Sequence, residues 1–180
     1  MTTTYRSDLE RGILAETNQQ KREALVDLLT TAYWMEMETV MSYMASSVNP
    51  DGVRAQEVVE ALSEDIREEL DHARRFATRI KELWGVVPGS GDFRAQQDFL
   101  APPENQTNIA HVIRGVIEAE KAAIAHYNEI IELCEGLDPV TQDMVTDILR
   151  DEEGHLRLFE GFLRELEPQP EVAVAAAVPA

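Results

Sequence analysis

Apolar residues recur at three- and four-residue spacing in four long stretches of the chain, which is the period of an amphipathic helix. The stretches cover residues 18–48, 53–84, 108–136 and 139–167. The first ends at Asn-Pro-Asp-Gly, a strong turn signal. The last begins with aspartate followed by proline, a favoured pair at the N-cap and the first helical position. The pattern therefore predicts four long helices.

The lengths of the connections predict how these helices are arranged. The first and third connections are a few residues long, so each joins an antiparallel hairpin. The middle connection, residues 85–107, is long enough to run back along a helix, and it admits a short helix over 92–100. Short, long, short is the connectivity of an all-α four-helix bundle with one crossover, the ferritin-like arrangement. We expect an N-terminal extension over 1–17 that admits a short helix, the bundle over 18–166, and an Ala/Val/Pro-rich tail over 167–180.

Composition narrows the classes of function. The 180 residues include 16 Lys and Arg and 34 Asp and Glu, for a formal charge of −18. That charge disfavours nucleic acid and anionic membranes as partners and favours cations. The single cysteine, Cys134, excludes an intrachain disulfide and a cysteine-based zinc site. No apolar run approaches the ~18–20 residues of a transmembrane helix, and the N-terminus lacks an apolar signal core, so we expect a cytoplasmic protein.

Charged residues interrupt the apolar stripe of every predicted helix. Each stripe contains one glutamate, and two stripes add a histidine three residues later: Glu36, Glu69 with His72, Glu120, and Glu152 with His155. Four buried carboxylates would repel one another strongly without compensating cations. Four glutamates carry −4, and two divalent ions carry +4. One Glu from each of two helices plus Glu-x-x-His from each of the other two is the ligand set of the di-iron and di-manganese bundles.

The two halves of the chain repeat this pattern. The two glutamates of the first half are 33 residues apart, and those of the second half are 32 residues apart. In each half the first glutamate is followed seven residues later by a tyrosine, Tyr43 or Tyr127. Surface ion pairs in an acidic chain do not account for such a repetition, which therefore favours a metal site.

Several short motifs resemble those of a known family. Residues 148–155, Ile-Leu-Arg-Asp-Glu-Glu-Gly-His, look like the fourth-helix motif of bacterioferritins. Residues 69–73, Glu-Leu-Asp-His-Ala, resemble their second-helix motif, and Glu36 with Tyr43 their first. Residues 120–127 are more similar to Dps-like and other ferritin-like proteins. The resemblance covers roughly residues 20–166 and implies the ferritin-like fold, a di-iron centre and ferroxidase chemistry.

This resemblance implies roles for individual residues. Two iron ions per chain would be held, and the catalysis carried, by Glu36, Glu69, His72, Glu120, Glu152 and His155. Manganese is an alternative because it shares these ligands. A metal-bound histidine usually donates its other N–H to a carboxylate, and in similar bundles the acid preceding the ligand glutamate reaches the histidine of the facing helix. We therefore pair Asp151 with His72 and Glu68 with His155. Tyr43 and Tyr127 are either core aromatics or support for the ligands.

The expected function is oxidation of Fe(II) by O2 or H2O2 for iron storage or detoxification, in a homo-oligomer that is either a dimer or a cage. The alternative is a di-iron or di-manganese oxidase or peroxidase, similar to rubrerythrin or manganese catalase, that forms no cage. Bacterioferritins bind haem through a Met directly after the second-helix glutamate; Leu70 stands there, so no haem is expected. A DNA-binding Dps role is disfavoured by the charge of −18.

Two assignments have rivals close in sequence. Glu38 competes with Glu36 and would otherwise lie near a subunit interface, and Glu118 competes with Glu120 from a face that looks solvated. His111 and His126 lie off the stripes and are expected at the surface, and Cys134 is expected to be a structural or exposed thiol. Four methionines are expected to serve in packing: Met35, Met37, Met41 and Met44.

Overall fold

The computed structural model describes residues 12–167. Within that part of the chain there are four long helices and no strands: α2 (Gln19–Val48), α3 (Gln56–Glu82), α4 (Ile109–Cys134) and α5 (Pro139–Leu166). Three 3-10 turns complete it: η1 (Glu16–Asn18), η2 (Ser90–Asp92) and η3 (Asp98–Leu100). This confirms the all-α four-helix bundle. None of these helices is long and apolar enough to cross a membrane.

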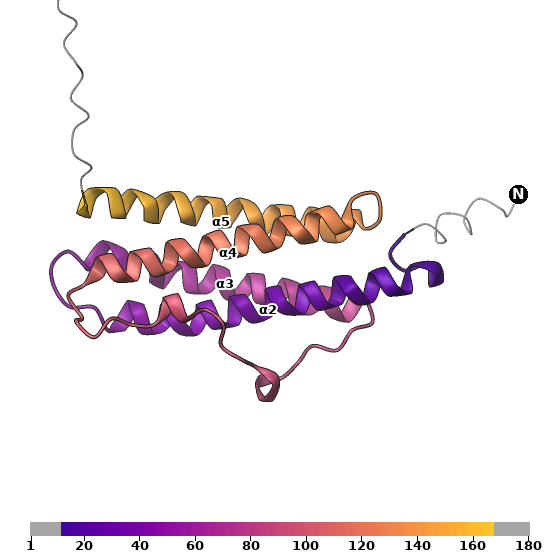
Figure 1. Cartoon of the computed structure of the whole chain (residues 1–180), viewed down its shortest axis with the longest axis horizontal. Helices are drawn as coiled ribbons and strands as arrows, with labels where there is room; N and C mark the ends of the chain where they lie inside the picture. The colour runs from indigo at the N-terminus through magenta and orange to yellow at the C-terminus, as the bar shows by residue number, and fades with distance from the viewer. Residues whose placement is uncertain (1–11, 168–180) are drawn as a thin grey trace, which may run out of the picture.

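The helices form two antiparallel hairpins, α2 with α3 and α4 with α5, that lie against each other along their whole length (Figure 1). The connection between α3 and α4 leaves one end of the bundle and returns along its side to the other end. The single long crossover is thus present as predicted, because α3 and α4 run parallel, which requires the chain to travel back a full helix length between them.

The interior divides into two apolar clusters, one toward each end of the bundle. One cluster contains Leu29, Phe76 and Tyr127, and the other contains Leu62 and Phe159 among its fully buried members. The layer between them holds polar side chains instead of apolar ones. The sequence forces this division, because the four stripe glutamates occupy the same level of the four helices.

Capping residues fix where the second hairpin begins and turns. The Asn108 side chain accepts a hydrogen bond from the His111 amide at the start of α4, and Asp138 does the same for the Thr141 amide at the start of α5. Gly136, between these helices, has φ of +67°, a left-handed conformation that glycine adopts without strain. The tight α4–α5 turn follows from these residues.

The crossover does not form the short helix that the sequence admitted over residues 92–100. It contains only the turns η2 and η3, joined by extended backbone. The reason is Glu38 of α2, which accepts hydrogen bonds from the Gln96 and Gln97 amides at 2.9–3.0 Å. Glu38 is itself buried. A helix at this point would need those amides for its own first turn, so the Glu38 carboxylate holds the segment extended.

The expectation for two of the methionines needs correction, and those for the chain ends fall mostly outside the described residues. Residues 1–11 and 168–180 fall outside the described residues, which leaves most of the expected extension and tail untested. The only helical turn described before α2 is η1, and Arg22 of α2 donates to the Ile13 carbonyl near it at 3.0 Å. Met41 and Met44 are about half exposed, so the packing role expected for them within the chain is wrong. They lie on the outer face of α2, away from the apolar stripe.

Arg79 of α3 ties the two hairpins together at one end of the bundle. Its guanidinium donates to both carboxylate oxygens of Asp138 at 2.9 Å and to the Thr141 hydroxyl at 2.7 Å. Asp138 is only 2% exposed, so its charge depends on this partner. Cys134 lies nearby and is fully buried, and burial raises the pKa of its thiol to about 12, consistent with a structural thiol.

Removing the Arg79 guanidinium should therefore destabilise the fold. We expect Arg79→Met to lower the free energy of unfolding by about 3–5 kcal/mol, because it leaves a buried carboxylate unpaired. Arg74→Met, at an exposed position of the same helix, should stay within about 0.5 kcal/mol of wild type. Urea unfolding followed by circular dichroism measures both. Similar small losses in the two variants would contradict this role for Arg79.

Candidate metal centre

The middle layer of the bundle brings together one glutamate from each helix. Each is 1–2% exposed, because three- and four-residue spacing puts it on the same stripe as the apolar residues above and below it. His72 and His155 follow one turn after the α3 and α5 glutamates and enter the same layer, at 2% and 8% exposed. All six residues that the sequence singled out as ligands thus lie in one buried cluster: Glu36, Glu69, His72, Glu120, Glu152 and His155.

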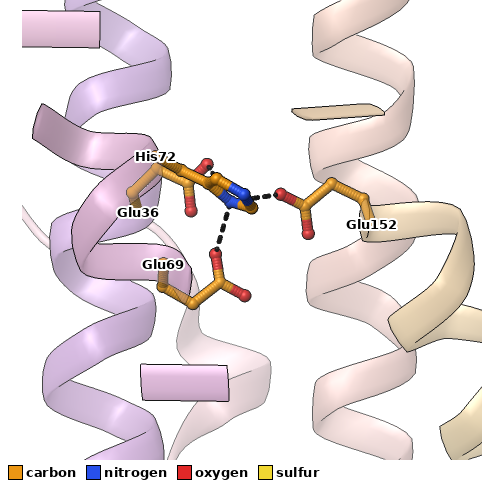
Figure 2. Close-up of side chains that lie close together, drawn as sticks. All are labelled: Glu36, Glu69, His72 and Glu152. Atoms are coloured by element: carbon orange, nitrogen blue, oxygen red, sulfur yellow. Dashed lines mark ion pairs between the residues drawn. The ribbon is translucent and has the colours of Figure 1, made fainter. Parts of the chain in front are cut away.

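The cluster consists of two sets of possible donor atoms. In the first set, one atom each from Glu36, Glu69, His72 and Glu152 lie within 4.8 Å of one another. Figure 2 shows this set, with the His72 ring between Glu69 on its own helix and Glu152 on the facing one. In the second set, Glu69, Glu120, Glu152 and His155 meet the same limit. Glu69 and Glu152 belong to both sets, so they lie where a carboxylate can bridge two ions.

The atoms that face the middle of this cluster lack hydrogen bonds. Among the described residues, six buried side-chain polar atoms have no hydrogen-bond partner. Five of them belong to the cluster: both carboxylate oxygens of Glu69, Oε1 of Glu152, and Nδ1 of His72 and of His155. His72 Nδ1 is 3.1 Å from Glu152 Oε1, close enough for attraction but without hydrogen-bond geometry. Buried polar atoms are rarely left unpaired, and a metal ion bound here would take these atoms as ligands.

The other ring nitrogen of each histidine faces a carboxylate. His72 Nε2 lies 3.3 Å from Asp151 of α5, and His155 Nε2 lies 3.0 Å from Glu68 of α3. These are the pairs that the sequence predicted. In the neutral ring that a metal needs as its ligand, an acid that accepts from Nε2 leaves Nδ1 unprotonated and aimed at the cluster. The rings are therefore oriented as ligands.

Two tyrosines hold the outer glutamates. The Tyr43 hydroxyl donates to Glu120 at 2.6 Å, and the Tyr127 hydroxyl donates to Glu36. Each bond crosses between α2 and α4, so each tyrosine supports the glutamate of the opposite half. Both rings are fully buried. Of the two roles considered for these residues, the contacts match support of the candidate ligands.

The rival residues lie elsewhere. Glu38 is buried and binds the crossover amides, not the cluster. Glu118 is exposed and pairs with Lys121 at 3.0 Å. His111 is at the surface as expected. His126 is not: its ring is largely buried and Nε2 lies 2.9 Å from the Leu28 carbonyl, because the α2–α4 contact covers it.

Sequence reasoning missed Asp65, one turn before Glu69 on α3. Asp65 is 6% exposed, its Oδ2 has no hydrogen-bond partner among the described residues, and its Oδ1 lies 3.7 Å from His155 Nε2. Burial, followed by neighbouring carboxylates and opposed by His155, raises the pKa of Asp65 to about 6. The four-residue spacing from Glu69 was a usable signal, but it is common in a chain with 34 acidic residues.

Burial and crowding shift the pKa values of the cluster in a consistent way. Burial, and then the charges of Glu69 and Glu152, raise the pKa of Glu36 and of Glu120 well above the usual value. Burial alone would lower the pKa of each histidine, but the surrounding carboxylates outweigh it and raise the pKa of His72 to about 10 and of His155 to about 9. Without metal, bound protons therefore reduce the repulsion that ions would otherwise relieve.

Comparison with known proteins agrees with this architecture. Residues 26–168 match the family model described as the ferritin-like domain. The DNA protection during starvation protein of Pyrococcus furiosus is 29% identical over 145 residues, covering 78% of this chain and 77% of the relative.

A bacterioferritin and a bacterioferritin-related protein are also similar to this chain. The bacterioferritin of Desulfovibrio desulfuricans is 24% identical over 148 residues, covering 82% and 78% of the two chains. Its X-ray structure, described for a di-iron site in different catalytic states, aligns with a TM-score of 0.69 at 22% identity and covers 82% of each chain. A bacterioferritin-related protein of Bacteroides fragilis, described as a dodecameric thioferritin, aligns with a TM-score of 0.73 at 25% identity, over 81% of this chain and 87% of that one.

The raised pKa values predict how stability depends on pH and metal. A raised folded pKa means that the folded chain holds protons that the unfolded chain releases, so this stabilisation is complete below the unfolded pKa and is lost as pH rises through the folded one. For the histidines, that window runs from about 6.5 to about 9–10. The melting temperature in chelator should therefore fall across this range, as calorimetry can measure.

Metal should reverse that trend. An ion that binds only the folded chain adds about 2.7 kcal/mol at 100 times its Kd, and it competes with protons, so the gain from Co(II) or Mn(II) should grow with pH. Glu118→Gln, at an exposed site, should keep the wild-type profile, and His72→Gln/His155→Gln should flatten it. A metal-free melt that is constant or rises from pH 6.5 to 9, or a melt unmoved by saturating metal, would count against a core metal site.

Proposed function

The chain belongs to the ferritin-like domain family, and we propose that it oxidises Fe(II) at a dinuclear centre formed by the buried cluster, in the service of iron storage or detoxification. Iron storage or protection is the role that its relatives' names indicate. Dinuclear Fe(II) oxidation is the finer step, and it rests on the donor atoms of this chain.

The observation that carries the proposal is the pair of donor sets that share Glu69 and Glu152. Two divalent ions, one in each set, would have one histidine and one outer glutamate apiece and two bridging carboxylates in common. Four carboxylates and two neutral imidazoles then balance the charge of two divalent ions, −4 against +4. The buried atoms without hydrogen bonds are the ones this arrangement would use.

Two Fe(II) ions held side by side would supply one electron each to a two-electron oxidant. With peroxide, 2 Fe(II) + H2O2 + 2 H+ gives 2 Fe(III) + 2 H2O; with dioxygen, 2 Fe(II) + O2 + 2 H+ gives 2 Fe(III) + H2O2. The protein's part is to hold both ions within electron-transfer reach of one oxidant molecule. Asp151 and Glu68 orient the imidazoles, the tyrosine hydroxyls fix the outer carboxylates, and the two apolar clusters keep bulk water from the layer.

The charge of the chain bears on its partners. At −18, the protein would be repelled by the phosphates of duplex DNA. Any protection of DNA, the role named for the Pyrococcus relative, would then follow from removal of Fe(II) and oxidant and not from contact with DNA. Leu70, at the position where bacterioferritins carry the haem-binding Met, is 52% exposed and offers no ligand atom. We propose a homo-oligomer of di-iron subunits without haem; the B. fragilis neighbour is described as a dodecamer.

The ligand assignment predicts which variants lose metal. Glu69→Ala and Glu152→Ala should each abolish dinuclear binding, because each removes a carboxylate shared by both donor sets. Glu118→Ala and Glu153→Ala, at exposed positions, should still bind two ions per chain. Anaerobic Co(II) titration with metal analysis after desalting measures the stoichiometry. Two ions per chain retained in the Glu69→Ala/Glu152→Ala double variant would refute the assignment.

Stepwise iron addition tests the chemistry and separates storage from other enzymes. Anaerobic Fe(II) at two per chain, then mixed with O2 or H2O2, should give a near-ultraviolet ferric absorbance rise faster than in buffer. The protein should also show no Soret band and no shift of duplex DNA at physiological salt. Soluble turnover well beyond two irons per chain, with ferric mineral retained in a large assembly, supports storage.

Two other results would change the conclusion. A stop at two irons per chain, with no cage by native mass spectrometry, would overturn storage and favour the di-iron oxidase or peroxidase. Oxidation no faster than in buffer with either oxidant would reject ferroxidase activity.

A further inference from the structure

We propose that the oxidant, a small neutral molecule of the O2 or H2O2 class, enters the cluster between α2 and α4, and that Gln97 of the crossover controls this entrance. The inference rests on the proposed function, to which it adds a route and a residue.

A small cavity opens from the cluster toward the α2–α4 side. Its volume is about 10 Å³, roughly the least that holds one water-sized molecule. All four glutamates line it, and neither histidine does. The rest of its wall comes from α2, α4 and the crossover: Met35, Thr39, Tyr43, Ala119, Ala123 and Gln97. The two alanines, one turn apart on α4, leave the space that larger side chains would fill.

Gln97 is the cavity's cover on the crossover side. Its side chain lies inward at 6% exposed, while its neighbours in sequence, Gln96 and Asp98, are exposed. Its side-chain nitrogen, Nε2, donates to the Met35 carbonyl at 2.9 Å and to the Thr39 hydroxyl at 3.2 Å. Among the described residues of the crossover, Gln97 is the one that lines the cavity.

The crossover backbone is held in place independently of this side chain. Glu38 accepts from the Gln96 and Gln97 backbone amides on the α2 side. On the α4 side, the segment approaches so closely that a Cβ on Gly115 would lie 2.4 Å from the Phe99 carbonyl oxygen. Only glycine permits this contact. Replacing the Gln97 side chain would therefore change the cover without releasing the segment.

The opposite side of the cluster has different chemistry. There the histidine rings face Asp151 and Glu68, whose side chains are 43% and 56% exposed. Exposed carboxylates attract cations, whereas a neutral oxidant gains no such long-range attraction. On the α2–α4 side, the Gln97 amide and the Thr39 hydroxyl are uncharged, and the passage is too narrow for a bulky substrate. The two faces thus suit two different reactants.

Variants at Gln97 that change the cover in opposite directions test this route. Gln97→Ala should open the passage and Gln97→Phe should narrow it, with Gln96→Ala and Gln96→Phe as matched controls on the exposed neighbour. The first readout is the association rate of nitric oxide with the anaerobic Fe(II)-loaded protein in stopped flow, which measures access without turnover. The second is the ratio of oxidation rates with tert-butyl hydroperoxide and with H2O2. Binding of two Co(II) per chain checks each variant's fold.

We expect Gln97→Ala to raise the nitric oxide rate and to increase the tert-butyl hydroperoxide ratio about tenfold, the discrimination that a steric wall typically supplies. Gln97→Phe should lower the nitric oxide rate, and the Gln96 variants should match wild type. Unchanged rates in Gln97→Ala would overturn the route, even if Gln97→Phe failed to fold. Equal changes in the Gln96 variants would overturn it too. If wild-type protein oxidised Fe(II) no faster than buffer, the proposed function would fail, and nitric oxide binding would still decide the route.

Discussion

Four carboxylates buried in one layer of a helical bundle are the constraint around which this molecule is arranged. Charged groups leave water only at a large free-energy cost, and like charges at close range add to it. The surrounding side chains reduce that cost. Tyrosine hydroxyls donate to the outer glutamates, and the imidazoles lie between the inner ones. The apolar clusters confine the charges to a single layer. This arrangement leaves the inner oxygens without hydrogen bonds, which is what a metal-binding layer requires.

Much of this arrangement could be predicted from the sequence because it is periodic. The helices and the inward direction of Glu36 follow from three- and four-residue spacing, which is local information. The two Glu-x-x-His pairs could be distinguished from chance because both halves repeat them. Helix ends agreed with the structure within three residues, since turn and cap signals act over short distances.

What the sequence could not show depends on partners far away in the chain. Glu38 looked like a surface or interface residue, yet its partners are amides 58 and 59 positions later, and no local pattern announces them. His126 looked exposed, yet its ring meets a carbonyl of another helix, 98 positions earlier. Asp65 was hidden by the abundance of acids. For Glu38 and His126 the missing information was which distant segment packs against the residue, a property of packing and not of period.

The division of the interior into two apolar clusters also bears on how the molecule moves. Each cluster is a compact set of contacts between all four helices at one end, and between the two clusters the side chains in the interior are a layer of charged and polar groups. Local opening in proteins follows such cooperative units, so either end of the bundle can loosen without the other losing its packing. The central layer then acts as the coupling between two half-molecules. Whatever ion occupies it sets how strongly a fluctuation at one end is felt at the other.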